Sequence, residues 1–122
     1  MIKSFLFVAM GGALGASARY GLHVLINQWL SRPMLATLLA NSVGCLLMGM
    51  AFQWIYQRYP NMDESLRLFI TVGFLGALTT WSTFSMETVT LLMENQYAAA
   101  MTYFLLTSLL CLGAFFLGTK LL

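Results

Sequence analysis

Charged residues are scarce in this sequence. Six lysines and arginines and four aspartates and glutamates make up 8% of the 122 residues, and 60% are hydrophobic. Soluble domains carry about 25% charged residues, roughly three times this share. So few charged side chains cannot cover a fold surrounded by water, which excludes a soluble enzyme, a nucleic-acid-binding protein and a disordered chain. The net charge of +2 is too small to indicate a polyanionic partner.

Metal-ligating residues are scarce as well, since the chain has two cysteines and one histidine. Cys45 and Cys111 both lie inside apolar runs, and neither has a Cys or His neighbour at the spacing of metal ligands. We predict that both are small buried apolar side chains that form no disulfide and no metal site.

Long uncharged runs are abundant instead. Residues 33–57, 68–86 and 95–119 carry no charge, and residues 4–31 carry only Arg19. A transmembrane helix needs about 20 predominantly apolar residues. We therefore predict an all-α membrane protein with a single four-helix domain over residues 1–122. Its transmembrane helices are expected near residues 3–29, 34–57, 66–93 and 97–120.

The distribution of positive charge gives a weak indication of orientation. Four spans place both ends of the chain on one side, and lysines and arginines are enriched on the cytoplasmic side of membrane proteins. The side with the chain ends would hold Lys3, Arg58, Arg67 and Lys120, whereas the other would hold Arg32 and, if shallow, Arg19. The difference favours a cytoplasmic N-terminus but is compatible with insertion in either orientation.

Small residues recur at helical spacing along three of the expected spans. Gly11 with Gly15, Ala40 with Gly44, and Ala114 with Gly118 are each four positions apart, the spacing that allows helices in membranes to approach closely. Packing within one subunit explains most of these pairs. A bundle of four helices fills its interior with side chains, so we expect any transport to need an oligomer.

The third span contains an unusual density of hydroxyl groups. Seven of the twelve residues from Thr79 to Thr90 are serine or threonine. Single hydroxyls in a helix usually bond to its own carbonyls, but seven beside two glycines and aromatic rings favour a broken or pore-lining helix. Irregular backbone at membrane depth is tolerated only inside protein or along a polar cavity. Freed carbonyls there suit a cation, and freed amides and hydroxyls suit an anion.

Other polar and aromatic side chains are candidates for the lining of such a cavity. Trp81 and Phe84 share one helical face, and their electropositive ring edges would serve either an anion or ordinary aromatic packing. Asn41 lies in the middle of the second span, where its amide would bond another helix or a passing ion. Tyr103, Thr107 and Ser108 place hydroxyls on one side of the last span.

Three ionisable residues also lie within the expected spans. Arg19 would either reach the membrane surface or mark a water-filled vestibule that concentrates anions. Glu87 is the only carboxylate deep in a span, and it would pair with Arg19 or carry protons. We expect His23 to lie at the interface.

Three segments together resemble the Fluc-type (CrcB-like) fluoride channels. They are residues 11–20 (GGALGASARY), residues 37–44 (TLLANSVG) and residues 73–84 (GFLGALTTWSTF). The resemblance implies an antiparallel, dual-topology homodimer in the bacterial inner membrane, with two fluoride pores along the subunit interface. It implies a fluoride path lined by Asn41, Trp81, Phe84 and hydroxyls such as Thr83. It also implies a structural sodium ion held by the Gly76 and Thr79 carbonyls of both subunits at a break in the third helix.

The sequence departs from the family pattern at two positions. Trp81 stands where the family has phenylalanine, and its larger indole keeps an electropositive ring edge and adds an N–H donor. Ala36 stands where glycine usually precedes Thr37, and we expect only altered packing. The chemistry otherwise suits fluoride, because a dry pore must replace its hydration shell with many hydrogen bonds that still permit exit. Neutral donors such as Asn41, Thr83 and Ser108 meet that need, and Tyr103 adds one more.

The sequence therefore predicts a passive fluoride-selective channel, with no enzymatic activity, that exports fluoride across the inner membrane. The alternative is a small proton-coupled multidrug exporter of four helices that uses Glu87, because that class needs a titratable carboxylate facing its cavity. A non-transporting assembly subunit is the third possibility.

Overall fold

Four long helices account for nearly the whole chain in the computed structural model, which describes all 122 residues. They are α1 (Ile2–Leu30), α2 (Pro33–Arg58), a segmented third span (Glu64–Met93) and α6 (Tyr97–Leu121). All four are long and apolar enough to cross a membrane, and the chain contains no strand. The prediction of an all-α protein with four helices of membrane-spanning length is confirmed.

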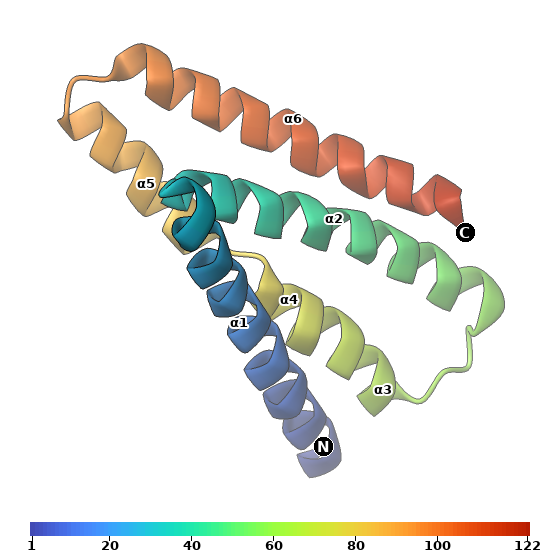
Figure 1. Cartoon of the computed structure of the whole chain (residues 1–122). Coiled ribbons are helices and arrows are strands. Elements are labelled where there is room, and N and C mark those ends of the chain that lie inside the picture. Colours follow the sequence, from blue (N-terminus) through green and yellow to red (C-terminus); the bar gives the residue numbers. More distant parts are fainter.

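The third span consists of four helical segments. These are α3 (Glu64–Leu68), the π-helix η1 (Phe69–Leu75), the short α4 (Gly76–Leu78) and α5 (Trp81–Met93). Thr79 (φ −92°, ψ 155°) and Thr80 (φ −149°, ψ 121°) have extended backbone between α4 and α5. Figure 1 shows this short non-helical junction midway along the span. We refer to these two residues as the Thr79–Thr80 junction.

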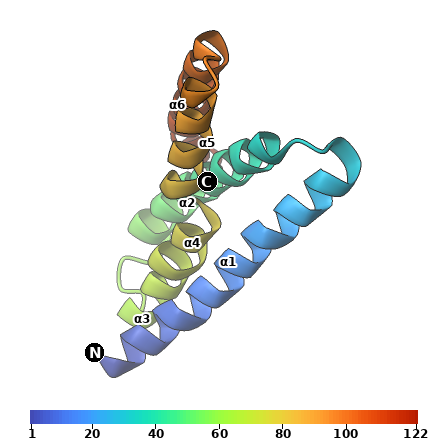
Figure 2. The ribbon, with the colours of Figure 1, turned by 90° about the vertical axis from the view of Figure 1, so that its left-hand side faces the viewer.

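The helices form two packed groups, one on each side of the molecule, that meet at the junction. On one side α1 runs along α3, η1 and α4, and on the other α2 runs along α6, with α5 leading to α6 (Figure 1). Figure 2 shows α1 inclined away from α5 and α6, so that the two sides diverge. The junction therefore lies where α2 meets the segments of the third span.

Glycines make the closest helix contacts. A Cβ at Gly15 would collide with the Phe74 carbonyl of η1, and a Cβ at Gly49 of α2 would collide with the Phe115 carbonyl of α6. Gly118 of α6 faces the Leu46 carbonyl of α2 in the same way. The small residues of α1 and α6 thus serve packing within the chain, as the sequence indicated.

Little of the chain is buried, with 19 of 122 residues in that class. The largest buried apolar cluster consists of Phe84, Leu91, Ala100 and Tyr103, between α5 and α6. Many large apolar side chains are exposed along all four spans. Such a surface suits contact with lipid or with another protein chain.

Candidate functional site

An open groove of about 390 Å³ lies between α2, the junction, α5 and α6. Its wall combines polar, thiol and aromatic groups at the depth where the third span loses its helical hydrogen bonds. The lining residues are Asn41, Cys45, Thr79, Thr80, Trp81, Phe84, Thr107, Ser108, Cys111 and Leu112. The structure therefore brings four of the six predicted pathway residues, namely Asn41, Trp81, Phe84 and Ser108, to one groove.

Asn41 holds the junction with two hydrogen bonds. Its Nδ2 donates to the Thr80 carbonyl at 3.1 Å, and its Oδ1 accepts from the Thr80 backbone N–H at 2.7 Å. The side chain is buried on α2, so the bond between helices is one role of this amide. An asparagine amide has two N–H donors, and the second remains available to a ligand in the groove.

The junction leaves several backbone groups without helical partners, and the chain satisfies most of them. The Thr79 hydroxyl lies 3.1 Å from the Leu75 carbonyl oxygen and 3.3 Å from that of Gly76, and it can donate to either. Arg19 Nε donates to the Ala77 carbonyl at 3.0 Å. No group of the chain donates to the Thr79 carbonyl, which is therefore free to bind a ligand.

Thr80 also begins the helix that follows. Its Oγ1 accepts from the Thr83 backbone N–H at 3.2 Å, as an N-cap residue does. The same hydroxyl donates to Thr83 Oγ1 at 3.3 Å, which leaves the Thr83 hydrogen free. Thr83 is a half-buried member of this cap and does not line the groove.

Three aromatic rings follow one another from the groove into the core. The Trp81 and Phe84 centroids are 5.1 Å apart, and those of Phe84 and Tyr103 are 5.2 Å apart. Phe84 is 2% exposed, whereas Trp81 is 70% exposed. Phe84 is thus fixed by its neighbours, while Trp81 stands at the outer edge of the groove with one side uncovered.

Arg19 and Glu87 have separate partners in the structure. Tyr103 donates its hydroxyl to Glu87 Oε1 at 2.8 Å, and Arg19 bonds the Ala77 carbonyl instead. The pairing of Glu87 with Arg19 that the sequence left open does not occur. His23 lies in α1, where its ring nitrogens contact the Arg19 carbonyl and the Thr37 hydroxyl.

Several hydroxyls bond to their own helices. Ser108 donates to the Phe104 carbonyl at 2.8 Å, and Thr88 donates to the Phe84 carbonyl at 2.8 Å. Thr107 differs, because its hydroxyl is buried and has no partner, although it lines the groove. The sequence places this hydroxyl on one side of the last span, but Thr107 was not among the predicted pathway residues. An orphan buried hydroxyl is costly, and only the neighbouring helices reveal that it is unpaired.

The two cysteines are also closer to the groove than the sequence indicated. Both are free thiols that are half-buried rather than buried in the chain. Cys45 comes from α2 and Cys111 from α6, and both line the groove. Their sequence neighbours are apolar, and the pattern gave no sign of this meeting.

Four apolar spans with a polar groove between them define a multi-pass membrane protein. The family model described as "CrcB-like protein, Camphor Resistance (CrcB)" matches residues 6–119. The chain belongs to this family, which confirms the resemblance found in the sequence.

Curated relatives cover most of the chain. A protein of Hahella chejuensis is 41% identical over 125 residues, which cover 98% of this chain and 94% of the relative. One of Erwinia tasmaniensis is 44% identical over 97 residues, with 80% and 77% covered. One of Pasteurella multocida is 41% identical over 99 residues, with 81% and 77% covered. Each is named "Fluoride-specific ion channel FluC". The four spans and these bacterial relatives indicate a multi-pass protein of the bacterial inner membrane.

Proposed function

We propose that the protein is a passive fluoride-selective channel, not an enzyme, that exports fluoride across the inner membrane. The observation that carries the proposal is the groove of neutral hydrogen-bonding groups and aromatic edges beside the Thr79–Thr80 junction. Fluoride is small and strongly hydrated, so a pore must offer several donors that still release it. The names of the relatives support fluoride as the ion, and they favour the channel over an exporter that uses Glu87.

Two antiparallel copies of the chain would complete the pores. The groove is open on one side, and Trp81 at its edge is 70% exposed. A second copy would cover that side, and the dual-topology homodimer that the family resemblance implies would form two such pores at its interface. The scarcity of buried residues in one chain supports a partner of this kind.

The proposed fluoride path uses the residues that the sequence singled out. Asn41 and Trp81 offer N–H donors, Phe84 offers an electropositive ring edge, and hydroxyls complete the path. The hydroxyls predicted for it are those of Thr83, Tyr103 and Ser108, of which only Thr83 keeps a hydrogen that is not donated within the chain. Arg19 would attract anions toward a vestibule with its remaining guanidinium N–H groups, since only Nε is bonded in the chain.

A structural sodium ion is proposed at the junction. Backbone carbonyls of an unwound membrane helix are suitable ligands for sodium. The Thr79 carbonyl accepts no hydrogen bond, and the Gly76 carbonyl is close only to the Thr79 hydroxyl, so both fit the role. Two carbonyls from each subunit would hold the ion at the dimer centre, where its charge would also offset that of a buried anion.

The proposal is tested by two substitutions in the path. Asn41→Asp keeps the acceptor for the Thr80 N–H but loses the donor and adds negative charge, and Phe84→Ile removes the ring edge. We expect each to reduce fluoride efflux from proteoliposomes at least tenfold without dissociating the dimer. Asn27→Asp and Phe116→Ile make the same chemical changes at exposed positions and should leave the efflux rate near wild type. Wild-type efflux from both path variants would contradict the proposal.

A further inference from the structure

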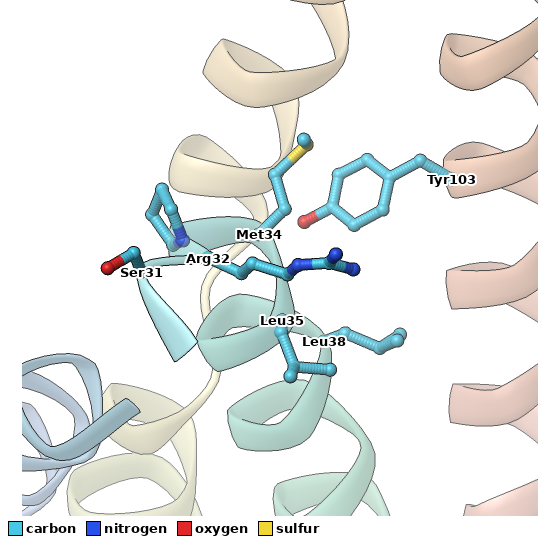
Figure 3. Close-up of a pocket in the computed structure, with 7 residues that line it drawn as sticks. Ser31, Arg32, Met34, Leu35, Leu38 and Tyr103 are labelled. Carbon is cyan, nitrogen blue, oxygen red and sulfur yellow. The ribbon is translucent and has the colours of Figure 1, made fainter. Parts of the chain in front are cut away.

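A second groove lies at the start of α2. It has a volume of about 460 Å³ and lies between the α1–α2 turn and α6. Figure 3 shows its lining, which consists of Ser31, Arg32, Pro33, Met34, Leu35, Leu38 and Tyr103. We call it the Arg32 groove.

The two grooves lie on either side of one aromatic pair. Tyr103 lines the Arg32 groove and packs against Phe84, which lines the first groove. Met34 and Leu38 of the Arg32 groove pack against the same cluster. The residues of α2 that face the two grooves, from Met34 and Leu38 to Asn41, follow one another at helical spacing. An ion that passed Phe84 would meet Tyr103 and then the Arg32 groove.

Arg32 is the only charged residue among those that line this groove. Its side chain is exposed and makes no hydrogen bond or ion pair within the chain, whose single ion pair joins Lys3 to Asp63. In Figure 3 the guanidinium extends across the groove toward the Tyr103 ring. The charge is therefore available to a mobile ion rather than being engaged in the fold.

The surroundings of Tyr103 would otherwise repel an anion. Because the Tyr103 hydroxyl donates to Glu87 Oε1, it presents an oxygen lone pair to the groove instead of its hydrogen. The Tyr103 oxygen that lines the groove therefore offers an approaching anion no hydrogen bond. A fixed positive charge at the same place raises the local anion concentration and accelerates entry.

We propose that Arg32 attracts fluoride to this end of the path and sets the rate at which the ion enters. The inference rests on the proposed channel function. It assigns Arg32 an electrostatic role that requires the charge alone, with no fixed contact to the ion. The role is separate from that of Arg19, whose Nε donates to the Ala77 carbonyl of α4.

The test is a series of charge variants measured at two ionic strengths. Initial fluoride efflux is recorded from proteoliposomes with Arg32, Arg32→Lys, Arg32→Gln and Arg32→Glu, in buffers of about 0.01 M and about 1 M sodium gluconate. Charges act over about 30 Å in the first buffer and about 3 Å in the second. Arg58→Gln removes an exposed arginine at the far end of α2 and serves as the matched control.

We expect the rates at low salt to follow the charge. Arg32→Lys should match wild type, Arg32→Gln should be about two- to threefold slower and Arg32→Glu slower still, as expected for one charge at close range in water. The differences should vanish at high salt and at saturating fluoride, which a purely structural effect would not do. Arg58→Gln should behave as wild type.

Three outcomes would overturn the inference in different ways. A wild-type protein that releases fluoride, with Arg32→Gln and Arg32→Glu at the same rate in low salt, would refute the role of Arg32 alone. A rate reduction that persists at high salt would also refute it, since it would indicate a role in folding or packing. A wild-type protein that releases no fluoride would overturn the proposed channel and the inference with it.

Discussion

Individual side chains at the groove divide into those that hold the fold and those that face the groove. Asn41 does both. Its amide makes two hydrogen bonds to the Thr80 backbone, and its second N–H is not donated within the chain. Thr107 is the clearest case of the second kind, since its buried hydroxyl has no partner in the chain. A hydroxyl that contributes no bond to the fold is available to an ion.

Thr107→Val tests this assignment. The substitution keeps the shape of the side chain and removes an unpaired polar group, which typically costs about 1–3 kcal/mol when buried. We expect an unchanged or higher melting temperature in detergent, together with slower fluoride efflux. Thr88→Val, which breaks the bond to the Phe84 carbonyl, should lower the melting temperature slightly and preserve efflux. Equal efflux from Thr107→Val and wild type would remove Thr107 from the path.

Helical elements are positioned by close contacts between glycines and the backbone of neighbouring helices. In α1 this contact involves Gly15, whereas Gly12 has no atom near its hypothetical Cβ. The two positions therefore form a matched pair within one helix.

Gly15→Ala should destabilise the protein, because the new methyl group meets the Phe74 carbonyl of η1. Overpacking of this kind costs about 1–3 kcal/mol. Gly12→Ala should be neutral or stabilising by up to ~1 kcal/mol, since alanine is the better helix former. Thermal melting in detergent measures both. A Gly15→Ala melting temperature equal to that of Gly12→Ala would show that α1 and η1 are not in this contact.

The start of α5 depends on one hydroxyl. Thr80→Val removes the acceptor of the Thr83 N–H, and loss of such a cap costs about 1 kcal/mol. Thr80→Ser keeps the acceptor and should keep the melting temperature. If valine and serine at this position melt alike, the cap contributes nothing to stability.

The sequence predicted the helical spans, but it did not predict which residues of different helices are in contact. The four spans follow from uncharged runs of sufficient length, which are visible without any fold. The π-helix η1 carries no comparable pattern, and it was not predicted. The partners of Arg19 and Glu87, the orphan state of Thr107 and the meeting of Cys45 with Cys111 depend on how α2, α5 and α6 pack. Spacing along one helix fixes a face, but it does not identify the helix opposite.

At the scale of the whole molecule, a single chain buries few of its residues. Its polar groove is open and its surface is largely apolar. We propose that a second, antiparallel copy and a central sodium ion complete it.

Removal of sodium tests this assembly. Ligand binding at a hundred times the dissociation constant adds about 2.7 kcal/mol to stability. Replacing sodium with N-methylglucamine should therefore lower the melting temperature of the detergent-purified protein and increase its monomer fraction in light scattering. Unchanged melting and an unchanged dimer without sodium would argue against the proposed ion.

The most direct test of the central claim is ion efflux from vesicles that contain the purified protein. Ion-selective electrodes would follow fluoride and chloride after addition of a potassium ionophore, with no proton gradient imposed. The account predicts fast fluoride efflux that needs no energy source, while chloride remains inside. Retention of fluoride, or release of both ions at equal rates, would contradict it.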